Sequence, residues 1–159
     1  MGVHRRIVAS SNGMATAEAE VVEPWFVSID PGLTTGLVIA QVSVRDIVML
    51  HEEPVPWSDR FALHRSLRWL PTKPTAIVIE AFKLFPHAAQ NQIGQEFPSV
   101  RVIGIVETYA YQLGLLSRLV FQPSSVRGRV QIKHDVMAND HVRDAYRHLR
   151  YYLTVNNLV

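Results

Sequence analysis

Two acidic residues stand directly after short apolar runs, where they could bind a metal ion or a proton. Asp30 follows the run WFVSI and precedes Pro31-Gly32, and Glu80 follows the run AIVI. A carboxylate beside a buried strand is costly to desolvate unless a cation pairs with it, so Glu80 is a candidate metal ligand. Asp30 has a second explanation, because aspartate is common in turns before Pro-Gly.

A third acid lies near the C-terminus, on a segment with helical periodicity from Asp140 to Leu153. Three polar residues would flank the apolar face of this helix: His141, Asp144 and His148. Three arginines would lie on the opposite side, toward solvent or a phosphate backbone: Arg143, Arg147 and Arg150. Ordinary i,i+3 and i,i+4 pairing, at about 0.2–0.5 kcal/mol per pair, explains the arginines but not a His/Asp pair beside the core.

Five strands and three helices must position these groups. The residue patterns predict strands at 25–29, 36–42, 46–50, 76–79 and 119–122, and helices at 58–70, 100–116 and 140–153, with a polar connection over 86–96. This order predicts an α/β fold: a mixed five-stranded sheet, with a three-stranded antiparallel meander plus parallel strands, flanked by helices. If strands 25–29 and 76–79 are adjacent and parallel, Asp30 and Glu80 meet at one edge of the sheet.

Composition bounds the remaining possibilities. The chain has 159 residues, 48% hydrophobic and 19% charged, which predicts one globular domain over residues 25–159 behind a flexible tail over 1–24. The longest apolar stretch, 100–121, contains Arg101 and Glu107, so we expect no membrane span. Cysteine is absent, which excludes disulfides and thiol chemistry and is compatible with the cytoplasmic location that we expect.

Basic residues are concentrated in the last third of the chain. Residues 100–159 carry eight lysines and arginines against four acids, although the whole chain has a net charge of only +2. A basic surface of this kind suits a polyanion such as DNA, and an ordinary solvated surface explains it equally well.

Four short segments follow one another on the expected elements. They are Asp30-Pro31-Gly32 with Thr35-Gly36, Glu80 after its apolar run, Pro123-Ser124-Ser125-Val126-Arg127, and His141-Val142-Arg143-Asp144-Ala145. Together they resemble the RuvC-type Holliday junction resolvases, which belong to the RNase H-like nuclease superfamily. The resemblance covers about Trp25 to Leu153 and depends on the order and spacing of the motifs.

The resemblance implies a metal-dependent endonuclease that nicks branched DNA, with four-way junctions as the expected substrate. Asp30 would bridge two divalent ions, Mg²⁺ or Mn²⁺, Glu80 and Asp144 would add carboxylates, and His141 would be a further ligand or proton carrier. Glu107 is a possible additional acid, and pairing with an arginine is its alternative role. DNA would be bound by six basic residues: Lys83, Arg127, Arg129, Lys133, Arg143 and Arg147.

A four-way junction has two symmetry-related strands to nick, which favours a homodimer. Helix 100–116 carries many apolar residues that could form the interface: Val102, Val106, Tyr109, Leu113 and Leu116. Burial of that helix within its own chain is the alternative. Two other functions stay open: a different RNase H-like nuclease acting on flaps, replication forks or RNA–DNA hybrids, and a non-catalytic module that binds DNA junctions.

Overall fold

The computed structural model describes residues 23–43, 46–59, 61–68, 73–83, 96–132, 137 and 139–159. Its elements, in chain order, are strands β1 (Trp25–Asp30), β2 (Thr34–Val42) and β3 (Ile47–Pro56), helix α1 (Ala62–Arg68), strand β4 (Ala76–Glu80), helix α3 (Pro98–Gln112), strand β5 (Leu119–Gln122) and helix α4 (Asp140–Val155). Two short 3₁₀ turns, η2 (Leu116–Arg118) and η3 (Ser124–Gly128), flank β5. The predicted order of strands and helices is confirmed.

The five strands form one mixed sheet in the order β3-β2-β1-β4-β5. Strands β1, β2 and β3 pair antiparallel as the predicted meander, and β1, β4 and β5 run parallel. In the registers of these strands Ile29 lies opposite Ile79, and Glu80 lies opposite Gln122. The carboxyl ends of three adjacent parallel strands therefore finish side by side.

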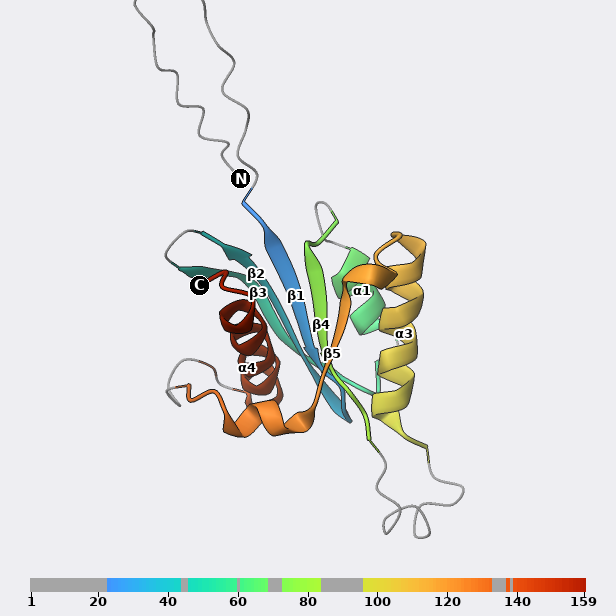
Figure 1. The fold of residues 1–159 in the computed structure, drawn as a ribbon. Coiled ribbons are helices and arrows are strands. Elements are labelled where there is room, and N and C mark those ends of the chain that lie inside the picture. Colours follow the sequence, from blue (N-terminus) through green and yellow to red (C-terminus); the bar gives the residue numbers. More distant parts are fainter. Residues whose placement is uncertain are drawn as a thin grey trace, which may run out of the picture.

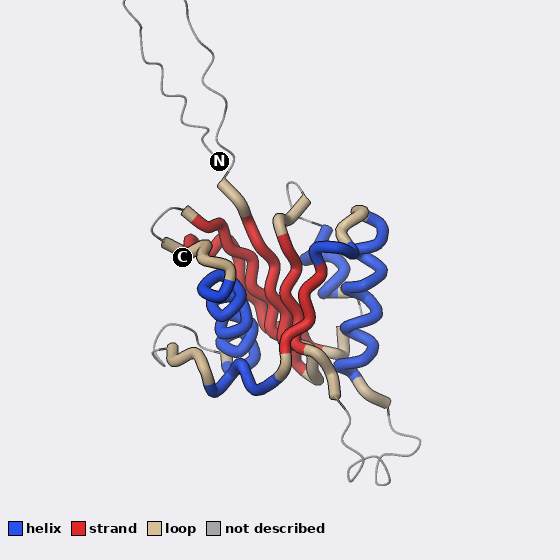
Figure 2. Tube along the Cα trace, in the orientation of Figure 1, coloured by secondary structure: helices blue, strands red, loops and turns tan. Residues whose placement is uncertain are grey.

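Helices cover both faces of the sheet, with α4 on one face and α1 and α3 on the other (Figure 1). Along β1 the side chains alternate between two apolar clusters, as a strand requires. Phe26 packs in the cluster under α4, whereas Val27 and Ile29 pack in the cluster under α1 and α3. The tube in Figure 2 shows the same three layers. By this alternation Asp30 faces α4.

Gly36 allows α4 to approach the sheet closely. This residue pairs with Asp30 across β1 and β2. A Cβ added at Gly36 would lie 2.0 Å from the carbonyl oxygen of His141, a distance that no side chain could accept. The glycine therefore places the first turn of α4 directly over the end of β1.

Several predicted boundaries differ from the observed elements. β3 continues to Pro56, six residues beyond its predicted end, because its second half keeps pairing with β2. α1 begins at Ala62 rather than at Ser58, because Asp59 accepts from the backbone N–H groups of Phe61 and Ala62. The predicted tail over 1–24 and connection over 86–96 fall largely outside the described residues.

The predicted dimer interface on α3 is wrong in part. Val102, Val106 and Tyr109 are buried against the sheet by their own chain, and Leu113 packs on the same apolar cluster. These residues form the buried face of the helix and are not available to a partner, whereas Val100 and Tyr111 on the same helix are exposed. Of the five predicted interface residues, Leu116 is the one that is exposed.

No helix in the described part of the chain is long and apolar enough to cross a membrane.

Candidate active site

Three adjacent strands end in polar side chains on the face that α4 covers. Asp30 ends β1, Glu80 ends β4, and Gln122 ends β5. Asp30 and Gln122 are buried, and Glu80 is half-buried. Each follows an apolar run that forms a strand, so the local sequence builds a rigid strand and places one polar group at its tip.

Helix α4 supplies a second row of polar side chains above the first. The side chain of Asn139 caps this helix by accepting from the backbone N–H groups of His141 and Val142. His141 Nδ1 lies 3.0 Å from Asp30 Oδ2, and one end of the row is thus joined to β1. His148 Nε2 lies 2.9 Å from Glu80 Oε2, which joins the other end to β4.

Arg127, in η3, lies among three carboxylates. Its Nη2 donates to Asp30 Oδ1 at 2.7 Å and to Glu80 Oε2 at 2.6 Å, and its Nη1 lies 3.1 Å from Asp144 Oδ2. These acids come from β1, β4 and α4, which are far apart in sequence. Because one guanidinium reaches all three, the carboxylates converge on a single cation.

The buried carboxylates have shifted acidities. Burial raises the pKa of Asp30 to about 6, although the charge of Arg127 and the hydrogen bond with His141 act in the opposite direction. Burial also acts to raise the pKa of Glu80, but hydrogen bonds from His148 and Arg127 outweigh it and hold that pKa below its usual range. Burial acts to lower the pKa of Arg127, and the charges of Asp30 and Glu80 raise it above its usual range. The site is therefore an acidic cluster that requires positive charge.

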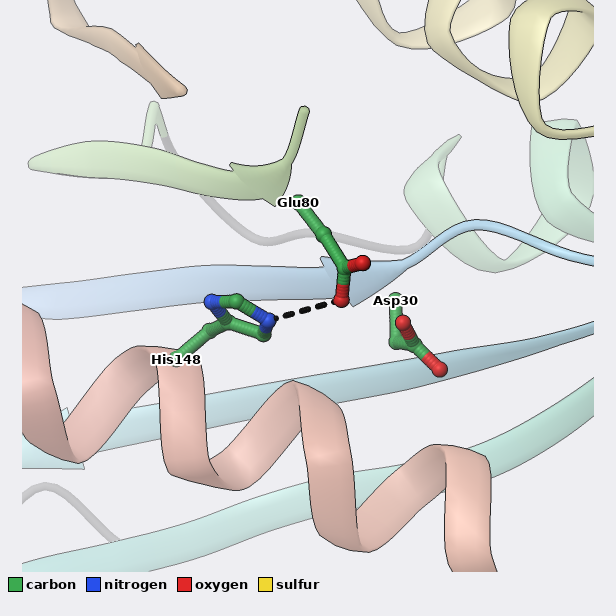
Figure 3. Close-up of side chains that lie close together, drawn as sticks. All are labelled: Asp30, Glu80 and His148. Atoms are coloured by element: carbon green, nitrogen blue, oxygen red, sulfur yellow. Dashed lines mark hydrogen bonds and ion pairs between the residues drawn. The ribbon is translucent and has the colours of Figure 1, made fainter. Parts of the chain in front are cut away.

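The donor set fits a divalent metal ion. One ligand atom each from Asp30, Glu80 and His148 lies within 4.8 Å of the others (Figure 3). Carboxylate oxygens suit hard cations such as Mg²⁺ and Mn²⁺, and an imidazole is a ligand that Mn²⁺ tolerates better than Mg²⁺. The convergence of Asp30, Glu80 and Asp144 on the Arg127 guanidinium shows that these carboxylates already point at a shared cation position.

The structure brings together the four predicted catalytic residues, Asp30, Glu80, His141 and Asp144, but not Glu107. Glu107 is exposed on α3, the helix that covers the opposite face of the sheet. It lies on the outer side of that helix because Val106 and Ala110 take the buried positions. The prediction of an additional acid at this position is wrong.

The predicted outward arginine stripe on α4 is also wrong for two of its three members. Arg143 is 7% exposed and donates to the carbonyl of Met137 and to Asp140. Arg147 is largely covered and pairs with Asp144. A long arginine side chain can fold back onto an acid three residues earlier, which turns it away from solvent. Arg150 is exposed as predicted.

Four further basic residues were predicted to bind DNA. Lys83 is exposed just beyond the end of β4. Arg129 is exposed after η3, where its Nη1 donates to the hydroxyl of Tyr151 at 3.2 Å. Lys133 lies outside the described residues. Arg127 lies in the acidic cluster itself, with 40% of its side chain exposed.

Sequence reasoning assigned no role to Gln122 or His148. His148 is completely buried, and its Nδ1 lies 2.9 Å from Gln122 Oε1. The signal for Gln122 was present, since it ends the run LVF as Asp30 and Glu80 end theirs. For His148 the helical pattern gave the correct face but no partner.

Comparison with solved structures identifies the fold. The chain matches T. thermophilus RuvC in complex with a Holliday junction substrate with a TM-score of 0.56 and 19% identity, over 84% of this chain and 96% of that one. It has the fold of the RuvC-type resolvases. Its mixed five-stranded sheet is thereby RNase H-like, as predicted.

Two structures of the Fowlpox virus Holliday junction resolvase show the same RuvC-type fold. The complex with substrate junction DNA matches with a TM-score of 0.54 and 11% identity, over 82% of this chain and 99% of that one. The second structure of this resolvase matches with a TM-score of 0.55 and 12% identity, over 83% of this chain and 99% of that one. The chain matches no protein-family model and no curated protein sequence. At these identities the likeness concerns the fold.

Proposed function

We propose that this protein is a metal-dependent, structure-specific endonuclease that nicks branched DNA, with the four-way Holliday junction as its main substrate. The observation that carries the proposal is the convergence of Asp30, Glu80 and Asp144 on one cation position. A buried acidic cluster is costly to maintain, and its placement at strand ends is typical of sites in open α/β sheets. The solved structures that share the fold include two complexes with Holliday junction DNA, which supports this choice of substrate.

Four side chains would hold two divalent ions, Mg²⁺ or Mn²⁺. Asp30, Glu80 and Asp144, which all contact Arg127, would supply carboxylates, and His141, which contacts Asp30, would be a further ligand. When bound, the ions activate a water molecule for attack on the phosphodiester and stabilise the leaving 3′ oxygen. The protein contributes carboxylates that are oriented in advance by β1, β4 and α4.

Arg127 would exchange its carboxylate partners for DNA phosphate when cations bind. Its guanidinium now neutralises the acids that the cations would neutralise. Its partly exposed side chain would then bind a phosphate at the edge of the site instead of the carboxylates. Further phosphate contacts would come from three basic residues: Lys83, Arg129 and Lys133.

A homodimer would present two such sites to the two strands that a junction resolvase must nick. The α3 residues buried in their own chain would not take part in the interface, which would use exposed residues instead. Sedimentation at micromolar concentration tests the assembly. A monomer that cleaves four-way junctions in paired, symmetric positions would contradict the dimer.

Cleavage of a panel of labelled DNAs tests the proposed substrate. The panel contains a four-way junction, a flap, a replication fork, a linear duplex and an RNA–DNA hybrid, each with Mg²⁺ or Mn²⁺. We expect symmetric nicks in the four-way junction at the highest rate. Preferential cleavage of the hybrid or the flap would favour a different RNase H-like nuclease, and binding of the junction without any cleavage would favour a non-catalytic module.

A further inference from the structure

His148 is a fully buried histidine that connects the end of β5 to the candidate active site. Its Nδ1 lies 2.9 Å from Gln122 Oε1, and its Nε2 lies 2.9 Å from Glu80 Oε2. Figure 3 shows the ring extending from α4 toward Glu80, with Asp30 beyond the carboxylate. Gln122, His148 and Glu80 thus form a continuous hydrogen-bonded chain, called the support chain below.

The apolar core does not require a histidine at this position. On α4, the neighbouring residues Ala145 and Leu149 pack fully buried in the cluster against the sheet. An aliphatic residue at 148 would pack there without removing polar atoms from water. A buried imidazole is tolerated because both of its nitrogens have partners, and those partners belong to the site.

The direction of the hydrogen bonds follows from the chemistry of the groups. An ionised carboxylate only accepts, so His148 Nε2 donates to Glu80. The amide of Gln122 has both donors and an acceptor, and it can therefore satisfy Nδ1 in any protonation state of the ring. The backbone of Gln122 is held in place, because it pairs in register with Glu80 across β4 and β5.

We propose that His148 and Gln122 are positioning residues, which hold the carboxylate of Glu80 in the orientation in which it binds a divalent cation. This inference rests on the proposed function. A glutamate side chain has several rotatable bonds, and without a partner it loses their conformational entropy when it binds a metal. The support chain restricts them beforehand. Loss of a residue that hydrogen-bonds to a metal ligand typically weakens metal binding by about 10–100-fold.

Direct ligation of the metal by His148 is the competing role, since its ring lies near Asp30 and Glu80. Substitution by glutamine separates the two roles. The glutamine amide can donate a hydrogen bond to Glu80 in place of Nε2. If His148 were itself a ligand, replacing its imidazole by an amide oxygen would shift the preference of the site from Mn²⁺ toward Mg²⁺. Rescue by His148→Gln with an unchanged ratio of Mn²⁺ to Mg²⁺ affinity, both measured by calorimetry, therefore indicates positioning.

The experiment measures Mn²⁺ binding to the DNA-free protein by calorimetry, beside thermal unfolding in chelator. We expect His148→Leu to weaken Mn²⁺ binding by about 10-fold or more, with His148→Gln close to the unaltered chain. Gln122→Met, which breaks the support chain without touching Glu80, should weaken binding in the same direction by less. The matched control is His51→Leu on β3, which removes an exposed histidine paired with Glu53 and should leave binding unchanged.

Equal Mn²⁺ affinity in folded His148→Leu and in the unaltered chain would overturn the inference. Loss of affinity in His148→Gln as large as in His148→Leu would also overturn it, in favour of direct ligation. If His148→Leu does not fold, unchanged affinity in Gln122→Met overturns it. Junction cleavage separates the two proposals: a protein that binds Mn²⁺ through the support chain but cleaves no DNA disproves the proposed function alone.

Discussion

The two faces of the sheet are built by the same strands but bury different chemistry. Beneath α1 and α3 the core is an apolar cluster, and the hydroxyl of Tyr109 reaches only to the backbone of Leu67. Beneath α4 the buried set includes Ser28, which donates to the carbonyl of Ala145, together with His148 and Asp144. Buried polar groups cost free energy unless they are paired. The comparison indicates that one face supports the fold and the other holds the chemistry.

The largest effect should come from adding a methyl group between the sheet and α4. Gly36→Ala places a Cβ against the backbone of His141, which no side-chain rotation can relieve. We expect a loss of at least about 3 kcal/mol in the free energy of unfolding, measured by urea denaturation.

Gly104→Ala on α3 is the matched control for Gly36→Ala. A Cβ at Gly104 meets nothing within 4 Å, so the substitution should stabilise the helix by about 0.5–1 kcal/mol. Equal effects of the two substitutions would contradict the close approach of α4 to the sheet.

The next largest effect distinguishes two residues on the first turns of α4. Asp144→Asn removes a carboxylate from the shared cation position, and we expect junction cleavage to fall by at least about 100-fold. His141→Asp should stay within about tenfold of the unaltered rate, because a carboxylate is also an acceptable ligand for Mg²⁺ or Mn²⁺. Single-turnover rates measure both, and similar rates for the two variants would show that their roles are wrongly assigned.

A smaller effect concerns stability and pH in the absence of divalent ions. Because the pKa of Asp30 is raised from 3.8 to about 6, its contribution to stability is full below about pH 4 and is lost as the pH rises through 6. At pH 8 the unaltered chain must bury an ionised Asp30, which costs free energy, and Asp30→Asn removes that cost. The variant should therefore be more stable than the unaltered chain at pH 8 by roughly 1–3 kcal/mol, and similar to it at pH 4. Urea denaturation in chelator at the two pH values measures the difference.

Asp59→Asn provides the opposite case on the α1 side of the sheet. Hydrogen bonding to Arg65 holds the pKa of Asp59 below its usual range, against burial, which acts to raise it, and Asp59 Oδ1 also accepts from the backbone N–H of Phe61 just before α1. Its stabilising contribution is present above the ordinary pKa and is lost as the pH falls. The substitution should therefore lower stability at pH 8, and a gain like that of Asp30→Asn would contradict the contrast between the faces.

The smallest effect should come from Glu107, on the face of the sheet that α1 and α3 cover. Glu107 is exposed on α3, away from the acidic cluster, so Glu107→Gln should leave both the cleavage rate and the metal requirement unchanged. A single-turnover assay in parallel with Asp144→Asn measures this. A large loss in Glu107→Gln would show that the site extends beyond the α4 face.

The sequence predicted the fold well because local patterns determine most of it. The runs at 25–29 and 76–79 are apolar and β-branched enough to require a buried sheet, and the polar residue after each is visible in the sequence. The predicted parallel contact between those strands brought Asp30 and Glu80 to one edge, as observed.

The remaining site contacts depend on tertiary geometry that helical periodicity does not contain. A helical angle places His148 near the core, but its link to Gln122 depends on which strand neighbours β4. Similarly, the position of Arg127 in a motif does not reveal that η3 turns its guanidinium back toward three carboxylates. The buried orientation of Arg143 likewise depends on its hydrogen bond to the carbonyl of Met137.

Cleavage of a four-way junction by the unaltered protein and by Asp30→Asn, in chelator and after addition of Mg²⁺ or Mn²⁺, tests the central claim most directly. We expect no cleavage in chelator, recovery of the unaltered protein with either ion, and no recovery of Asp30→Asn. The variant should bind the junction at least as tightly, because loss of an acid reduces repulsion of phosphate. Cleavage by Asp30→Asn at the unaltered rate, or cleavage that persists in chelator, would contradict a metal-dependent nuclease site at the ends of β1 and β4.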